Sequence, residues 1–264
     1  MAEPSKSSRT SERQRRQFEE RDRLIREAAE RLLAERGLHG FSMDDVAEAI
    51  EYSKGTVYLH YTNKEDALVA GCADAMGRLA GWLERAAAYE GSSRERMAAI
   101  VESHAQFVRV RPVDFSIVPI MHSPTVLEKA APERIRAIDA ARARSMAACT
   151  GIVREAVAVR DLVLAPSTRP EDVTFALWSL LLGAHMIHDM HAPDGLLGVT
   201  DASAAVRLHL ETYMDGLGWK PILRASESAA SLRRIRETLF PGQDSGPRLG
   251  RRGAGRRGAR SSAP

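Results

Sequence analysis

Three helix starts are predicted between residues 42 and 63 of this 264-residue chain. Ser42 is placed to cap one helix, Ser53 a second, and either Asn63 or Thr62 a third. Ser42 is followed by Asp45 in the arrangement of a capping box, which specifies the first start strongly. Because the starts are so close together, the first two helices are short, and the link between them has the length found in a helix-turn-helix.

A longer amphipathic helix precedes these starts. In "RLIREAAERLLAERG" the apolar residues recur at helical spacing, with Arg and Glu on the other face. Gly37 follows the last turn, where a glycine ends many helices. Upstream of this helix, residues 1–17 are rich in Ser, Arg and Glu and are predicted to be a disordered basic arm.

The remainder of the chain is also predicted to be helical, so the fold class is all-α. Hydrophobic residues make up 44% of the sequence, and no long alternating runs typical of strands occur. Residues 241–264 form a Gly/Arg-rich tail that is predicted to be disordered. Between Gly and Pro breaks, further helices are predicted at about 67–89, 93–109, 113–121, 125–160, 170–190, 201–217 and 224–239.

Charge and cysteine content bear on partners and compartment. The net charge is only +3, but arginines crowd both ends, which indicates either a polyanionic partner or solvated tails. Cys72 and Cys149 are the only cysteines and make no disulfide framework, so a cytoplasmic location is expected. The polar N-terminus is unlike a secretory signal, and the apolar run at 175–187 is too short to span a bilayer, so no membrane partner is expected.

Residues 21 to about 70 resemble the DNA-binding domain of the TetR family of transcriptional regulators. The residues that carry the resemblance are "AAERLLAERGLHGFSMDDVAEAI" followed by "SKGTVYLHYTNKEDAL". The resemblance implies a three-helix helix-turn-helix domain at 18–68 and a larger helical domain at 69–240 that binds an effector and dimerises. One departure is Glu51, which stands in a turn where the family often has glycine.

The function implied is sequence-specific DNA binding by a transcriptional regulator, with no enzymatic activity. Repression is the family's usual mode, with release from a palindromic operator in double-stranded DNA by a small-molecule effector of unknown identity. Two other functions stay open from the residues themselves. One is non-specific DNA binding through the Arg-rich ends, and the other is a helical metalloenzyme that uses the run of His185, His188 and His191. No metal site and no cofactor is predicted.

The segment after Ser53 has the composition of a DNA-reading helix. Gly55 lets the backbone approach a duplex closely, while the hydroxyls of Ser53 and Thr56 can hold phosphate oxygens and Lys54 can reach a phosphate or a guanine. The resemblance places Thr56 and Tyr58 near the groove, and it allows Tyr61 to be a core anchor instead of a DNA contact. The full predicted DNA-binding set is Ser42, Ser53, Lys54, Gly55, Thr56, Tyr58, His60, Tyr61 and Lys64.

The resemblance also implies a homodimer formed through the C-terminal helices at 170–190 and 201–217. The predicted seam, for which an intramolecular core is the alternative, is Leu177, Leu180, Leu181, Ala184 and Ile187. Bulky residues on the surrounding helices are candidates for the effector site, although they could equally be ordinary core. These candidates are His104, Phe107, Phe115, Met121, Phe175, Trp178 and Met186.

Overall fold

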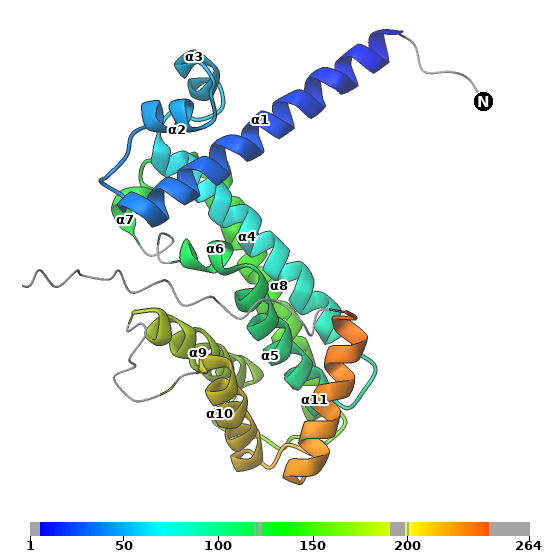
Figure 1. Cartoon of the computed structure of the whole chain (residues 1–264). Coiled ribbons are helices and arrows are strands. Elements are labelled where there is room, and N and C mark those ends of the chain that lie inside the picture. Colours follow the sequence, from blue (N-terminus) through cyan, green and yellow to red (C-terminus); the bar gives the residue numbers. More distant parts are fainter. Residues whose placement is uncertain (1–5, 119, 121–122, 191–198, 200, 243–264) are drawn as a thin grey trace, which may run out of the picture.

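The computed structural model describes residues 6–118, 120, 123–190, 199 and 201–242, and these residues form helices joined by turns and loops (Figure 1). The all-α prediction is therefore confirmed for this part of the chain. The helices are α1 (Lys6–Arg36), α2 (Met43–Ala49), α3 (Lys54–Tyr58), α4 (Lys64–Ala87), α5 (Ser93–Val110), α6 (Pro112–Ser116), α7 (Pro124–Leu127), α8 (Pro132–Ala158), α9 (Pro170–Met190), α10 (Ala202–Gly216) and α11 (Ala225–Leu239).

A small head is formed by the C-terminal half of α1 together with α2, α3 and the start of α4 (Figure 1). Its core contains Ile25 from α1, Val46 from α2, Val57 from α3 and Leu68 from α4, each with no measurable exposure. Gly37 ends α1 with a φ of 71°, and its N–H donates to the carbonyl of Leu33 at 2.9 Å. The head is thus built from parts of two long helices and from two short ones, which meet around a few fully buried aliphatic side chains.

The larger part of the molecule is organised by α4, which packs along α8 and α5. A second core, from the C-terminal half of α4 through α5, α8, α9, α10 and α11, is centred on residues such as Leu83, Val173 and Trp219. Because α4 begins in the head and ends in this second core, the predicted boundary at 68/69 falls inside a continuous helix. The division into domains at 18–68 and 69–240 stays a prediction.

Three helix boundaries differ from those predicted. Residues 6–17 are helical, whereas disorder was expected, because Arg, Glu and Gln favour helix and extension of an existing helix needs no new nucleus. The helix expected at 113–121 ends at Ser116. The helix expected at 125–160 is two helices, since Pro132 lacks an N–H and begins α8 at its first turn.

Among the described residues, no helix is both long and apolar enough to cross a membrane. Cys72 and Cys149 are free and buried. Burial raises the pKa of each thiol to about 12, which makes both of them poor nucleophiles at neutral pH.

Candidate nucleic-acid interface

The start of α2 is fixed by the predicted capping box. The backbone N–H of Asp45 donates to the Ser42 hydroxyl at 3.3 Å, and the Ser42 N–H donates to the Asp45 carboxylate at 2.8 Å. The hydrogen bond from the Ser42 side chain is the main reason that the pKa of Asp45 is lowered. Ser42 itself is exposed, so it holds the helix start and remains accessible from outside.

A tight turn then sets the direction of α3. The Tyr52 N–H donates to the Ala47 carbonyl at 3.0 Å, and Glu51 adopts a φ of 57°. The Ser53 hydroxyl accepts from the Thr56 N–H at 3.2 Å, so Ser53 caps α3 as predicted. Local hydrogen bonds thus define both ends of the link.

α3 is held to the head by one buried side chain and presents the rest outward. Val57 is fully buried, whereas Lys54, Gly55 and Tyr58 are exposed and Thr56 is half-buried. A Cβ atom placed on Gly55 would meet nothing in the protein closer than 3.9 Å. Packing within the chain therefore does not require glycine here, and the missing side chain leaves room for an outside molecule to approach the backbone.

Lys54 has an acidic neighbour on the same surface. Its ammonium group donates to the Asp44 carboxylate from α2, and this hydrogen bond is the main reason that the pKa of Lys54 is raised. Both side chains are substantially exposed, so the pair contributes little to stability and exchanges readily. A phosphate could replace Asp44 as the partner of Lys54.

Three residues expected to contact DNA are occupied inside the protein. The His60 ring is almost completely buried and stacks on Phe18, with ring centroids 4.0 Å apart. Tyr61 is 1% exposed and lies under the Arg134 guanidinium, which confirms the alternative that it is a core anchor. The partner of His60 comes from α1, which is why the local sequence did not reveal its buried position.

Lys64 is the third of these residues. Its ammonium donates to the carbonyls of Leu38 and Phe41, each at 2.6 Å, and lies over the Phe41 ring. It therefore ties the start of α4 to the loop before α2. With His60, Tyr61 and Lys64 set aside, the exposed candidates for DNA contact are Ser42, Ser53, Lys54, Gly55, Thr56 and Tyr58.

The effector-site candidates divide into three groups. The rings of Phe115, Trp178 and His185 surround His104, with centroids 5.1–6.0 Å from its own. Phe107 lies instead against Trp82 in the second core. Met186 is half-buried and Met121 lies outside the described residues.

Phe175 was wrongly expected to line an internal site. Its side chain is 74% exposed on α9, because the apolar positions that face inward on this helix are Leu177 and Leu181. These two leucines belong to the intramolecular core, which was the alternative to the predicted dimer seam. Leu180 and Ile187 do reach the surface.

His104 is the most unusual group in the larger domain. It is 1% exposed, and its Nδ1 has no hydrogen-bond partner among the described residues. Burial, with a smaller contribution from His185, lowers the pKa of His104 to about 3, so the ring is neutral at physiological pH. The ring offers one unsatisfied polar atom in aromatic surroundings.

The histidine run does not form a metal site within the described part of the chain. His185 is buried, its Nδ1 lies 2.8 Å from the Leu181 carbonyl, and its Nε2 lies 3.2 Å from the Ser203 hydroxyl. The side chain of His188 and all of His191 lie outside the described residues. Over the residues described, no group of three or more His, Cys, Asp or Glu side chains is arranged to hold a metal ion.

The head matches a known family of sequences. Residues 25–70 match the model described as "Bacterial regulatory proteins, tetR family". The fatty acid metabolism regulator protein of Bacillus subtilis (strain 168) is 29% identical over 80 residues, which are 30% of this chain and 41% of that protein. The match thus spans less than half the length of this curated relative.

Solved structures of similar fold cover most of the chain. A tetR-family regulatory protein from Rhodococcus RHA1 is 18% identical with a TM-score of 0.60, over 76% of this chain and 98% of its own. PfmR, a TetR-family regulator from Thermus thermophilus, is 23% identical with a TM-score of 0.57, over 78% and 98%. A transcriptional regulator from Saccharomonospora viridis, solved in complex with choline, is 19% identical with a TM-score of 0.56, over 75% and 96%. At these identities the likeness shows a shared fold.

Proposed function

We propose that this chain, which belongs to the TetR family and is a DNA-binding transcriptional regulator, represses transcription from a palindromic operator as a homodimer. A small-molecule effector would release it from the DNA. This activity would be exercised in the cytoplasm, where the chromosome lies.

The outward face of α3 is the observation that supports operator binding. Lys54, Gly55, Thr56 and Tyr58 reach the surface from a helix that only Val57 anchors. We expect Thr56 and Tyr58 to meet base edges, and Lys54 and the Ser53 hydroxyl to hold phosphates. The Ser42 hydroxyl donates to the Asp45 carboxylate and would have to exchange that partner for a phosphate. One five-residue helix reads few base pairs, so selective binding needs a second copy related by a twofold axis.

Exposed apolar side chains on the last two long helices support the dimer. Phe175 is 74% exposed and Leu180 is 36% exposed on α9, and Leu208 is 63% exposed on α10. These two helices pack against each other, so their outer surfaces are near one another. Apolar side chains gathered there are suited to an interface with a second copy.

The surroundings of His104 support an effector site in the larger domain. A neutral ring with an unsatisfied nitrogen among Phe115 and Trp178 suits a largely apolar molecule that carries one hydrogen-bonding group. Phe115 lies in α6, whose neighbour Asp114 accepts from Arg78 of α4 at 2.9 Å. An effector that favours one position of α6 would thereby bias α4, which carries the head.

Binding of variants to DNA tests the proposed reading face. A duplex would first be enriched from a random-sequence pool by the full chain, and affinities would be measured by fluorescence anisotropy. Thr56→Ala is expected to weaken binding to this duplex by about 5- to 150-fold for each half-site, which is the loss of a base interaction worth ~1–3 kcal/mol, with little change for unrelated DNA. Thr168→Ala, in the loop between α8 and α9, is the matched control and should bind normally.

The competing function makes the opposite prediction. If DNA is bound only through the Arg-rich ends, Thr56→Ala and wild type should bind equally, and all binding should be lost when residues 1–17 and 243–264 are removed. That outcome would refute the proposal.

A further inference from the structure

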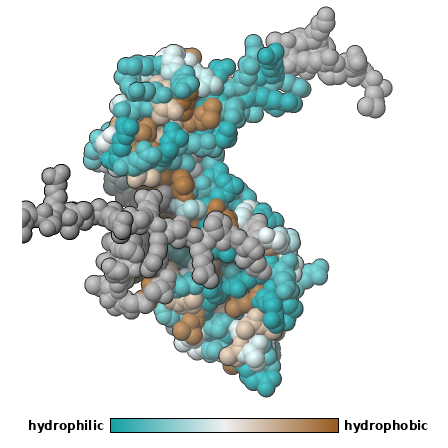
Figure 2. All heavy atoms as spheres, viewed as in Figure 1, coloured by the Kyte–Doolittle hydropathy of each residue, from teal (hydrophilic) through white to brown (hydrophobic). Residues whose placement is uncertain are grey.

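The N-terminal part of α1 extends beyond the core of the head. Residues 11–20 are all exposed, and the first fully buried residue of α1 is Ile25. Figure 1 shows this part of the helix projecting past α2 and α3, and Figure 2 shows that its visible surface is hydrophilic. Apolar burial therefore does not account for its presence.

The extension nevertheless contacts the residues that directly follow α3. Phe18 stacks on His60 just beyond α3, at an interplanar angle of 21°. Asp22 lies one turn further along α1, and its carboxylate is 3.5 Å from Nδ1 of His60. These contacts fix how the extension is aimed relative to α3.

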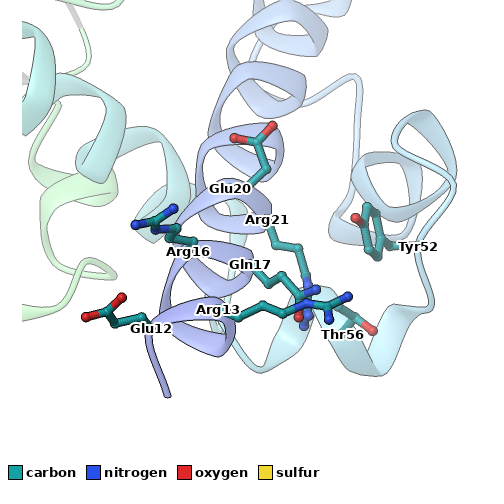
Figure 3. Close-up of a pocket in the computed structure, with 8 residues that line it drawn as sticks. All are labelled: Glu12, Arg13, Arg16, Gln17, Glu20, Arg21, Tyr52 and Thr56. Carbon is teal, nitrogen blue, oxygen red and sulfur yellow. The ribbon is translucent and has the colours of Figure 1, made fainter. Parts of the chain in front are cut away.

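The arginines of the extension differ in whether a carboxylate pairs with them. Arg15 pairs with Glu19, and Arg23 pairs with Glu20 and Glu27. Arg13, Arg16 and Arg21, by contrast, make no ion pair with any described residue. Of these three, Arg13 and Arg21 are directed toward α3 (Figure 3).

Arg13, Gln17 and Arg21 are four residues apart, so they lie on one face of α1. They line a groove of about 680 Å³, whose other wall includes Tyr52 and Thr56. Figure 3 shows these three side chains directed from α1 toward Thr56, and Glu12, Arg16 and Glu20 also line the groove. Two guanidinium groups without carboxylate partners thus face the residue proposed to read bases.

We propose that the α1 extension is a second DNA-binding element, in which Arg13 and Arg21 hold the phosphate backbone beside the major groove that α3 enters. This inference rests on the proposed function. Guanidinium groups bind phosphate through paired N–H donors, and each contact releases counterions from the duplex. Such contacts add affinity without sequence preference, whereas Thr56 on the facing wall supplies preference.

The salt dependence of binding tests this element. The double variant Arg13→Gln/Arg21→Gln should reduce the slope of log Kd against log salt by roughly 3–4 for a dimer, at about 0.9 for each phosphate that is no longer neutralised by an arginine. The reduction should be the same for the enriched duplex and for unrelated DNA, and the ranking of mismatched duplexes should not change. Arg13→Lys/Arg21→Lys keeps the charges and should retain most of the slope.

Arg15→Gln/Arg23→Gln is the matched control, because it removes the same charge from the same helix at positions already paired with glutamate. Circular dichroism would verify that both double variants keep their helix content. An equal slope change in the control, or an unchanged slope in Arg13→Gln/Arg21→Gln, would overturn the inference. If Thr56→Ala still weakens selective binding in that case, the proposed function stands while the second element does not.

Discussion

At the scale of single residues, Glu30 is a carboxyl group that its surroundings in the head perturb strongly. It lies buried between α1 and α4, and a Cβ atom placed on Gly71 would overlap its carboxylate. Burial, reinforced by the carboxylate of Asp114, raises the pKa of Glu30 to about 7, although Arg78 and Arg26 oppose the shift. The glycine in α4 thus makes room for a carboxyl group that is largely protonated below neutral pH.

Glu30→Gln should change how stability depends on pH. Between pH 4.5 and about 7 the folded wild type holds a proton that the unfolded chain releases, so its free energy of unfolding falls as pH rises. Glu30→Gln has no such proton, and it should become more stable than wild type across this window, by at most ~3 kcal/mol. Urea unfolding from pH 4.5 to 8.5 would measure the difference. Parallel curves of the free energy of unfolding against pH for the two proteins would contradict the prediction. Glu27→Gln, which changes an exposed residue one turn earlier in α1, serves as the control.

How far the sequence predicts the site depends on how local each contact is. The caps at Ser42, Ser53 and Asn63 were predicted because each bonds to a backbone N–H three residues later. His60 and Lys64 were misjudged because their partners come from other parts of the chain, in α1 and in the loop before α2. Local chemistry predicts where α3, the proposed reading helix, begins, while tertiary contacts decide which neighbouring side chains are exposed.

At the scale of elements, helices whose ends carry local signals were predicted better than helices without such signals. The positions of α2 and α9 were predicted because caps and prolines mark their ends. The N-terminal extension of α1 was not predicted, because its polar composition resembles that of a disordered arm. The signal that could have revealed it is the spacing of arginines and glutamates by three and four residues, which stabilises a helix.

The link between α2 and α3 should become more stable with glycine at position 51. Glu51 has a φ of 57°, which costs a non-glycine residue about 1 kcal/mol. Glu51→Gly should therefore raise the free energy of unfolding by roughly that amount, as measured by chemical denaturation. Glu48→Gly is the control, because in α2 the same change should lower stability by about 1 kcal/mol. Destabilisation by Glu51→Gly would show that the Glu51 side chain makes a favourable contact that outweighs the strain.

At the scale of the whole molecule, the proposed function requires that two heads be presented together. α4 runs from the head into the second core, so the orientation of α3 is tied to the surface formed by α9 and α10. A dimer formed through that surface would fix the distance between the two reading helices. This links oligomeric state directly to operator binding.

Phe175→Glu should separate the proposed dimer. A charge on an apolar interface is unfavourable, so the variant should sediment as a monomer at micromolar concentration and bind the enriched duplex at least about 10-fold more weakly. Val163→Glu is the matched control, since Val163 is 79% exposed in the loop between α8 and α9 and should leave the dimer intact. A Phe175→Glu protein that remains dimeric would place the interface elsewhere.

The most direct test of the central claim is the symmetry of the DNA that the full chain selects from random duplexes. Two copies that each place α3 in a major groove should enrich a near-palindrome, with half-site centres about one helical turn, ~34–36 Å, apart or a multiple of it. Thr56→Ala should alter base preference equally in both half-sites. Enrichment of no motif, or of a motif without twofold symmetry, would contradict it.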